Sequence, residues 1–210
     1  MVRLIATGAP KSGTTALTIL IETGFGIPRS RGALGQRAGV GDVWITLDEG
    51  VCDGKLVRPL AEGLAQMKEG EMMQAHIAPR PELDGYKVIA ILRDPRDNVV
   101  SWFRAKRGNE PPNAKRRQAL RRFVERDQRL MPWIKSMRRW QRHPNALVVQ
   151  YDSLFAPETV ARIAAFLDRP TINADHLYGT GPTWSGAPSD WREWFDAGTV
   201  QLFESKWKHV

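Results

Sequence analysis

One continuous apolar run, from Tyr86 to Leu92, most restricts how this chain can fold. A run without polar alternation is typical of a strand that is covered on both faces, as strands are in a parallel sheet. Arg93 ends the run, and Asp94 and Pro95 follow as a helix N-cap and a first helical residue. We therefore expect a buried strand followed at once by a helix that extends to about Arg107.

The rest of the chain alternates between strand, loop and helix patterns. We expect further strands at 2–7, 72–77 and 146–150, and further helices at 14–22, 60–68 and 157–167, with one or two basic helices after a Pro-Pro-Asn break at 111–113. Residues 24–55 give no clear periodic signal. The alternation predicts an α/β fold of three layers with a central parallel sheet, in a single domain over 1–210. The C-terminal third, rich in Pro, Gly and Trp, is expected to return over the sheet.

Composition bears on the compartment and on the partners. Cys52 is the only cysteine, so no intramolecular disulfide can form, which fits a reducing compartment. No apolar run reaches 18 residues and the N-terminus does not resemble a signal peptide, so we expect a cytoplasmic protein that does not span a membrane. The net charge is +8, and residues 104–142 hold 14 Lys/Arg against 3 Asp/Glu. Such a block is either a solvated helix face or an anion-binding surface.

The loop Gly8-Ala9-Pro10-Lys11-Ser12-Gly13-Thr14-Thr15 lies between the first expected strand and the first expected helix. A loop of this kind presents backbone N–H groups and a helix N-terminus to an anion, so we predict phosphate binding. The two glycines have Walker spacing, but a Walker lysine follows the second glycine, where this chain has Thr14. Lys11 lies inside the loop instead. This difference argues against the triphosphate and magnesium of kinases and nucleotide hydrolases.

A second anion site is expected where the strand at 86–92 ends. Arg93 stands at that strand end, where ligands of parallel sheets gather, and Ser101 lies two turns into the next helix. A guanidinium and a hydroxyl in these positions can converge on one phosphate. The competing interpretation is a structural salt bridge between Arg93 or Arg96 and a neighbouring aspartate. Two anion sites on one sheet predict a ligand with two separated phosphate groups.

The two segments resemble the two signatures of the PAPS-dependent sulfotransferases, where PAPS is 3′-phosphoadenosine 5′-phosphosulfate. Residues 151–154 also resemble the family's Tyr-Glu-Asp-Leu segment. The resemblance implies a P-loop-like nucleotide-binding fold. It implies that the 5′-phosphosulfate is held by Pro10, Lys11, Ser12, Gly13, Thr14 and Thr15. It further implies that Arg93 and Ser101 hold the 3′-phosphate, and that Tyr151 and Gly186 belong to the cofactor site.

The chain departs from the family pattern at two places. Ala16 stands where the family's first motif ends in Trp. Residues 186–191 resemble the end of the family's Arg-Lys-Gly-x-x-Gly-Asp-Trp motif, but Trp184 and Ser185 replace the Arg and Lys that would touch the 3′-phosphate. We expect a basic residue from elsewhere to take their place, either Arg96 or one within 104–142.

Sulfuryl transfer needs a cation at the leaving phosphate and a base for the acceptor proton. Lys11 is the expected cation. His76 is the expected base, because it ends the strand expected at 72–77 and the family carries a catalytic histidine in a matching place. A near-neutral imidazole suits proton abstraction, and the competing interpretation is a packed or solvent-facing histidine. His143, His176 and His209 are expected at the surface.

The expected function is therefore transfer of a sulfuryl group from PAPS to a hydroxyl or amine of a small-molecule or glycan acceptor. Adenosine 3′,5′-bisphosphate is released, and no metal is expected. The alternatives are a P-loop kinase or nucleotide hydrolase, and a basic nucleic-acid-binding protein, for which no base-reading motif is present. The chain is short for the family it resembles, so the acceptor pocket is expected to be open or to be completed by a partner subunit, for example in a homo-oligomer.

Overall fold

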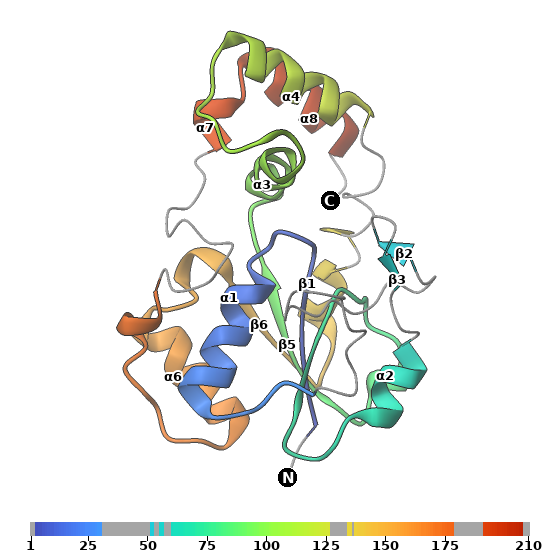
Figure 1. Cartoon of the computed structure of the whole chain (residues 1–210), viewed down its shortest axis with the longest axis vertical. Helices are drawn as coiled ribbons and strands as arrows, with labels where there is room; N and C mark the ends of the chain where they lie inside the picture. The colour runs from blue at the N-terminus through green and yellow to red at the C-terminus, as the bar shows by residue number, and fades with distance from the viewer. Residues whose placement is uncertain are drawn as a thin grey trace.

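Four parallel strands form the central sheet, in the order β4-β1-β5-β6 (Figure 1). They are Leu4–Gly8 (β1), Met72–Ala75 (β4), Lys87–Leu92 (β5) and Ala146–Gln150 (β6). The computed structural model describes residues 3–30, 51–52, 55–56, 60–126, 134–135, 137–178 and 191–207. Each strand lies where the apolar runs predict it, and the predicted parallel sheet is confirmed.

The strand order places the loops after β1 and β5 next to each other. Gly8 at the end of β1 pairs with Ile91 near the end of β5. On the other side of β1, Thr7 pairs with Ala75 at the end of β4. The chain continues from β1 to β4 on one side of the sheet and from β5 to β6 on the other, so the boundary between β1 and β5 is a topological switch point. In open α/β sheets, ligands bind at such a point, beyond the carboxyl ends of the strands.

The helices begin and end close to the predicted positions. They are α1 (Thr14–Ile19), α2 (Leu60–Gln66), α3 (Pro95–Arg107), α4 (Ala114–Arg126), α6 (Pro157–Leu167), α7 (Trp191–Trp194) and α8 (Ala197–Trp207). A π-helical turn over Leu20–Gly24 extends α1, and Val51–Cys52 (β2) pairs with Lys55–Leu56 (β3) as a separate antiparallel ladder. At the start of α3, the Asp94 carboxylate accepts the Arg96 N–H at 2.8 Å, as the N-cap prediction requires.

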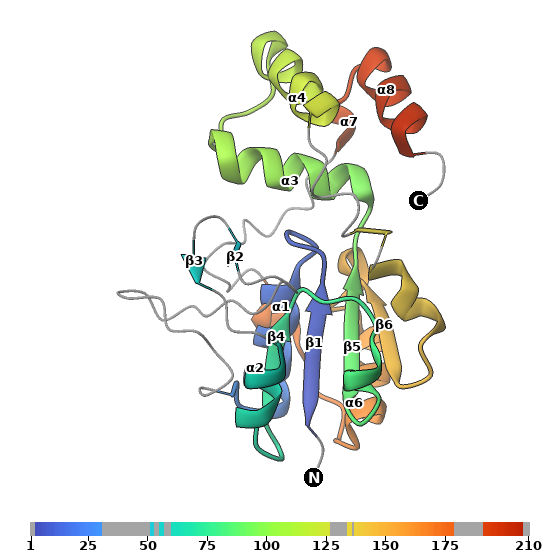
Figure 2. The ribbon, with the colours of Figure 1, turned by 90° about the vertical axis from the view of Figure 1, so that its right-hand side faces the viewer.

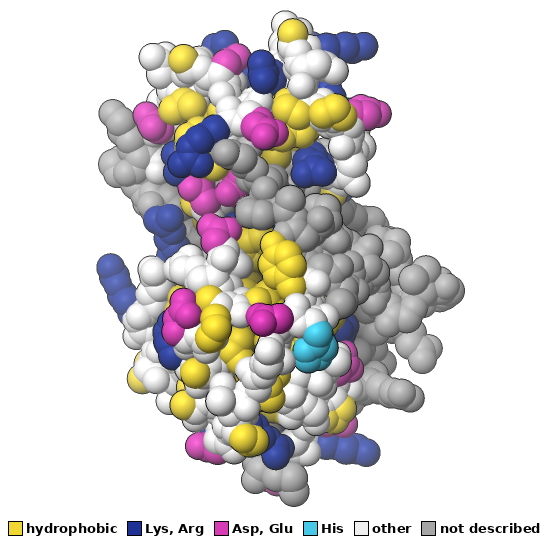
Figure 3. All heavy atoms as spheres, turned by 90° about the vertical axis from the view of Figure 1, so that its left-hand side faces the viewer, with side chains coloured by type: hydrophobic (Ala, Val, Ile, Leu, Met, Phe, Trp, Pro, Cys, Tyr) yellow, Lys and Arg dark blue, Asp and Glu magenta, His cyan; other side chains and the backbone are white. Residues whose placement is uncertain are grey.

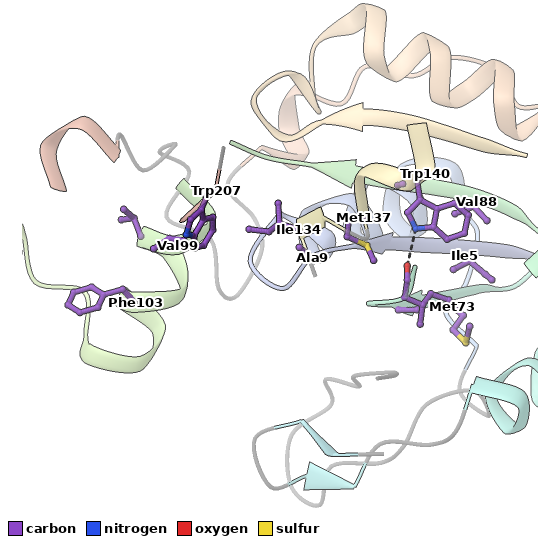
Figure 4. Close-up of a cluster of buried hydrophobic side chains, with 14 of the residues drawn as sticks. Ile5, Ala9, Met73, Val88, Val99, Phe103, Ile134, Met137, Trp140 and Trp207 are labelled. Carbon is purple, nitrogen blue, oxygen red and sulfur yellow. Dashed lines mark hydrogen bonds between the residues drawn. The ribbon is translucent and has the colours of Figure 1, made fainter. Parts of the chain in front are cut away.

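Helices α1 and α6 cover one face of the sheet (Figure 1). The other face packs against a second cluster of apolar side chains in which Trp140 is fully buried. Its indole Nε1–H donates to the Ile77 carbonyl at 2.9 Å, the bond drawn in Figure 4. Trp140 is thus a core residue, and both faces of the sheet are covered, as the apolar strands require.

The expected return of the C-terminal third over the sheet holds for α6, but it is wrong for α7 and α8. Helices α7 and α8 pack on α3 and α4 instead, at the end of the molecule away from the N-terminus (Figure 2). The Trp194 ring meets the Phe103 ring edge-on at 5.8 Å between centroids. The reason is that α3 and α4 bury apolar side chains such as Phe103 and Leu120, which need a partner surface of their own. Within the described residues, no helix has the length and apolar character needed to cross a membrane.

Candidate functional site

The loop after β1 has a tight backbone that only glycine permits at two positions. A Cβ at Gly8 would lie 2.7 Å from Ile91 Cγ2, and one at Gly13 would collide with the Tyr151 ring. Gly13 also has φ of 99°, in the left-handed region that favours glycine. Lys11 adopts φ of 68°, which is uncommon for a residue with a side chain. The loop therefore closes against β5 and Tyr151 with no room for larger residues.

Two hydroxyls of this loop are buried without a hydrogen-bond partner among the described residues. They are Ser12 Oγ and Thr14 Oγ1, on side chains that are 1% and 3% exposed. Each such group costs about 1–3 kcal/mol when it has no partner. The first N–H groups of α1 also lack intrahelical acceptors, as at any helix start. The loop thus has hydrogen-bonding capacity that phosphate or sulfate oxygens would fill.

Arg93 connects the segment that follows β5 to this loop. Its Nη1 donates to the Lys11 carbonyl at 3.2 Å, and its guanidinium lies 4.2 Å from the centroid of the Tyr151 ring. Residues that are far apart in sequence, at 11, 93 and 151, are thereby brought into one cluster at the switch point of the sheet. Because the guanidinium is held by the loop and the ring together, its position depends on both.

Of the two arginines considered for a structural salt bridge, Arg96 forms one with Asp94. Arg96 Nη2 and Nε contact the Asp94 carboxylate at 2.6 and 3.0 Å, and the Arg96 guanidinium stacks on Trp191 at 3.9 Å from the ring centroid. The competing structural interpretation is therefore confirmed for Arg96. Its charge is already matched by Asp94, which makes it a poor substitute for the missing Arg-Lys pair.

A cavity of about 500 Å³ opens beyond the ends of β5 and β6. Its wall is formed by Ala9, Ser12, residues 91–96, Asn98, Ile134, Met137, Arg138, Gln141, Gln150 and Asp152. Of the predicted site residues, Ser12 and Arg93 therefore line it. The volume is within the range of small-molecule sites, about 300–1,000 Å³.

Two residues of the cavity wall were not singled out from sequence. Asn98 is 1% exposed, and its Oδ1 has no hydrogen-bond partner within the described ranges. Its spacing of four from Asp94 and three from Ser101 on one helix could have indicated it. Arg138 is an exposed member of the basic 104–142 block. No local pattern distinguishes it from the other basic residues there.

Other predicted residues have different outcomes. Ser101 is partly exposed on α3, and no described contact joins it to Arg93 or to the cavity wall. Gly186 lies outside the described residues, as do Trp184, Ser185 and His209.

His176 is exposed, as expected, but the surface assignment of His143 is wrong. The His143 side chain is 11% exposed, because it packs edge-on against Trp140 and lies 3.4 Å from an Asp84 carboxylate oxygen.

His76 follows β4 and lies against the end of β1. Its Nδ1 is 2.7 Å from the Gly8 carbonyl, and because a carbonyl only accepts, Nδ1 carries the proton in the neutral ring. Nε2, which is buried, is then the unprotonated ring nitrogen and carries the lone pair. Burial lowers the pKa of His76 to about 4, opposed by the Gly8 hydrogen bond and assisted by the Lys11 charge. His76 is therefore neutral near pH 7, with a basic nitrogen at Nε2.

Asp97 ties the first turn of α3 to the C-terminal helices. The side chain is 7% exposed, and Oδ1 accepts the backbone N–H of Trp191 at 2.9 Å. Burial raises the pKa of Asp97 to about 6, while the charge of Arg93 lowers it. The carboxyl group therefore titrates within reach of neutral pH, next to the cavity wall.

Replacing Asp97 by asparagine should change how stability depends on pH. Between pH 3.8 and about 6 the folded state binds more protons at Asp97 than the unfolded state, so this group makes stability fall as pH rises. His76 has the opposite effect between about 4 and 6.5, because its folded pKa is depressed. Without Asp97, the free energy of unfolding should rise more steeply with pH across this window, by up to about 1.4 kcal/mol per pH unit.

Urea unfolding at several pH values across the window measures this slope. Asparagine retains an oxygen that can accept the Trp191 N–H, so the capping contact is kept. The matched variant His76→Asn should change the slope in the opposite direction. If Asp97→Asn leaves the slope as in the parent protein, the raised pKa assigned to this carboxyl group is wrong.

Comparisons with known proteins agree with this architecture. A profile described as "Sulfotransferase domain" matches residues 3–178. Among solved structures, the fold is similar to retinol dehydratase in complex with androsterone and inactive cofactor PAP, with a TM-score of 0.66, 20% identity, and 98% of this chain and 79% of that chain covered. It is also similar to mouse sulfotransferase SULT7A1 complexed with PAP, with a TM-score of 0.61, 18% identity, and coverage of 99% and 85%. No curated protein sequence gives a match.

Proposed function

The chain belongs to the sulfotransferase domain family, and from that premise we propose that it moves a sulfuryl group from PAPS to a hydroxyl or amine of a small-molecule or glycan acceptor. The products are the sulfated acceptor and adenosine 3′,5′-bisphosphate. Two proteins of similar fold are bound to PAP, which favours a PAPS-type donor here. One of them also holds androsterone, which favours a small-molecule acceptor.

The contact between Arg93 and the Lys11 carbonyl is the observation on which the donor assignment rests. It places the residue proposed for the 3′-phosphate beside the loop proposed for the 5′-phosphosulfate, as one doubly phosphorylated nucleotide requires. The buried, unfilled hydroxyls of Ser12 and Thr14 support the fit of an anion to the loop. The cavity between these elements has a volume suited to a small molecule.

The loop residues would hold the donor's 5′ end. We assign phosphosulfate oxygens to the hydroxyls of Ser12, Thr14 and Thr15 and to the backbone N–H groups around Gly13, with Pro10 shaping the loop. Lys11 supplies the positive charge that stabilises the leaving phosphate. When bound, the donor supplies an activated sulfuryl group, and the chain's part is to position it and balance its charge.

The other end of the donor would be held by Arg93 and Ser101, with Gly186 nearby. Tyr151 holds the Arg93 guanidinium in place through the stacking contact at 4.2 Å. Arg138, in the cavity wall, is our candidate for the charge missing at Trp184 and Ser185. Its side chain is exposed, so its guanidinium is accessible to an anion.

His76 is proposed to take the acceptor proton. The Gly8 carbonyl fixes the proton at Nδ1, so Nε2 is the nitrogen that receives the proton of the acceptor hydroxyl. Burial, assisted by the nearby Lys11 charge, lowers the pKa of His76 and keeps the imidazole neutral before the anionic donor binds. The base is thus unprotonated at neutral pH.

Thermal unfolding with adenosine 3′,5′-bisphosphate tests the donor site directly. At 100-fold excess over Kd, the nucleotide should stabilise the protein by about 2.7 kcal/mol. For a chain of this size this raises Tm by roughly 5–10 °C. Arg93→Ala should remove most of the shift, since it removes both the guanidinium and its support of the loop. The matched variant Arg169→Ala changes an exposed arginine beyond α6 and should keep the full shift.

The same assay separates the donor from a nucleoside triphosphate. ATP with magnesium should shift Tm less than the bisphosphate, because Thr14 occupies the position of the Walker lysine. A larger shift with magnesium-ATP would favour a kinase or nucleotide hydrolase and contradict the proposal. Incubation with radiolabelled PAPS and acceptors grouped as phenols, steroids, amines and glycans then identifies the acceptor class.

A further inference from the structure

A second hollow lies between α3 and α4, away from the cavity described above. Its volume is about 830 Å³. Six basic residues line it: Lys106, Arg107, Lys115, Arg116, Arg122 and Arg126. We call it the basic groove. It contains a large part of the charge excess of the 104–142 block, which the proposed transfer reaction leaves without a role, apart from Arg138.

The wall of the groove holds far more basic than acidic side chains. Glu110 is the one acidic residue in its wall, and Glu110 is paired with Arg116. Arg116 also donates to the Arg107 carbonyl at 3.2 Å, and its side chain is 12% exposed, so Arg116 belongs to the groove floor, whereas Glu110 is exposed. Within the described part of the chain, the side chains of Lys115 and Arg122 have no ion-pair partner.

The surface elsewhere is not uniformly basic. On the face shown in Figure 3, Lys and Arg side chains are interspersed with Asp and Glu. The groove instead gathers exposed cations from two helices around a concave floor. Along α4, Lys115, Arg122 and Arg126 are separated by about 10 Å and about 6 Å of helix rise. Cations in such a row are complementary to a chain molecule that carries anionic groups at intervals.

The aromatic residues in the floor argue against nucleic acid as this chain molecule. The Lys106 ammonium lies 5.4 Å from the Trp102 ring centroid, and the Arg116 guanidinium lies 5.5 Å from that of Phe103. The Phe123 ring meets Phe103 edge-on. Grooves that bind single strands offer open aromatic faces on which bases stack. Here cations of the protein lie over the Trp102 and Phe103 rings, which favours binding through ion pairs over base stacking.

The groove also lacks the features of a membrane contact. Interfacial surfaces combine cations with exposed large apolar side chains that enter the lipid. Among the described residues, Tyr178 is the large apolar side chain recorded as exposed, and it lies outside the groove. A hydroxyl-rich chain with carboxylate or sulfate groups needs neither stacking faces nor apolar anchors, and satisfies Arg and Lys through charge-assisted hydrogen bonds.

We propose that the basic groove binds an acidic oligosaccharide, with its carboxylate or sulfate groups on the exposed cations of α3 and α4. The proposal does not depend on the proposed transfer reaction, because binding needs neither donor nor turnover. The first turn of α3 contributes to the wall of the 500 Å³ cavity, and its last turn contributes to the wall of the basic groove. A bound saccharide would therefore lie about 20 Å or less from the cavity, the length of this helix.

Titration calorimetry with a sulfated, carboxylate-bearing hexasaccharide prepared from heparin tests the proposal on the full chain. The double variant Lys115→Glu with Arg122→Glu should weaken binding by at least about tenfold, and the parent's affinity should fall steeply between about 50 and about 200 mM salt. Glutamate in the first turn of α4 favours the helix dipole, so folding should persist, which circular dichroism checks.

The matched control is Arg142→Glu with Arg169→Glu. Both arginines are exposed and lie outside the groove, and this pair lowers the net charge by the same amount. It should change the affinity less than about threefold. Equal losses in the two double variants would reduce the effect to overall charge and overturn the proposal, as would no loss in either.

A single-stranded oligonucleotide of equal charge and an uncharged hexasaccharide complete the design. The uncharged sugar should not bind measurably. If the oligonucleotide bound more tightly than the acidic sugar and lost affinity in the groove variant, the occupant would be nucleic acid and the saccharide assignment would be wrong. Failure of the bisphosphate assay would leave this result untouched, so the two proposals fail separately.

Discussion

Replacing His76 by asparagine is expected to lower kcat by about 100-fold to 10,000-fold, the range that general-base catalysis supplies. The asparagine amide can still donate to the Gly8 carbonyl, which His76 Nδ1 contacts at 2.7 Å, so the local fold should survive. What is lost is the lone pair at Nε2. Initial rates with radiolabelled PAPS, together with the bisphosphate-induced shift in Tm, measure the two effects separately.

The pH profile provides a readout that a structural role would not alter. Since the pKa of His76 is lowered to about 4, kcat/KM, which reports the free enzyme, should rise with pH through about 4 and level off above it. The pH dependence of kcat reports the enzyme with its substrates bound. The rise of kcat with pH should occur at a higher pH than the rise of kcat/KM. The donor's negative charge would offset the Lys11 charge that now disfavours the imidazolium.

His176→Asn is the matched control, because His176 is exposed and does not line the cavity. It should keep normal kcat and the normal profile. Near-normal turnover in His76→Asn would remove His76 from the mechanism, whatever its position. Loss of both turnover and bisphosphate binding would instead assign His76 to the structure of the loop.

The second large effect is expected for Gly13→Ala. The backbone at Gly13 has φ of 99°, which costs a residue with a Cβ about 1–2 kcal/mol. The new methyl group would also collide with the Tyr151 ring, and overpacking of this kind typically costs about 1–3 kcal/mol more. The free energy of unfolding should therefore fall by about 2–5 kcal/mol, measured by urea unfolding.

Gly26→Ala separates the two causes of this loss. Gly26 also has a positive φ, of 67°, but no atom of the described residues lies within 4 Å of the Cβ it would gain. Its substitution should cost the backbone term alone, about 1–2 kcal/mol. Because Tyr151 holds Arg93, Gly13→Ala should in addition weaken binding of the bisphosphate, whereas Gly26→Ala should not. Equal effects in the two variants would contradict the proposed link from Gly13 through Tyr151 to Arg93.

Much of the fold could be predicted because its signals are local. The run that forms β5, its end at Arg93 and the Asp94-Pro95 helix start lie within ten consecutive residues, and each has a single structural meaning. The sheet order was not predicted. The contact of Arg93 with the Lys11 carbonyl depends on the register that sets Gly8 beside Ile91, and such pairing is not readable from local patterns.

The errors have a common physical origin. The aromatic residues of the C-terminal part indicate burial but do not indicate the surface against which they pack. Two surfaces were available, the sheet face and the helices α3 and α4. The sheet face is already covered by Trp140, so Trp194 packs on α3. His143 was expected at the surface, yet its ring packs against Trp140. In both cases the partner comes from a distant part of the chain.

The position of the C-terminal helices also decides where the protein can be shortened. The family match ends at residue 178, but Trp194, Phe195, Phe203 and Trp207 belong to the same apolar cluster as Ile5 and Val88. A version cut after Tyr178 would leave Phe103 and Leu120 facing water and would lose Trp191, whose N–H donates to the Asp97 carboxylate. The limits of recognisable homology and the limits of the folding unit therefore differ, and recombinant versions should extend at least to Trp207.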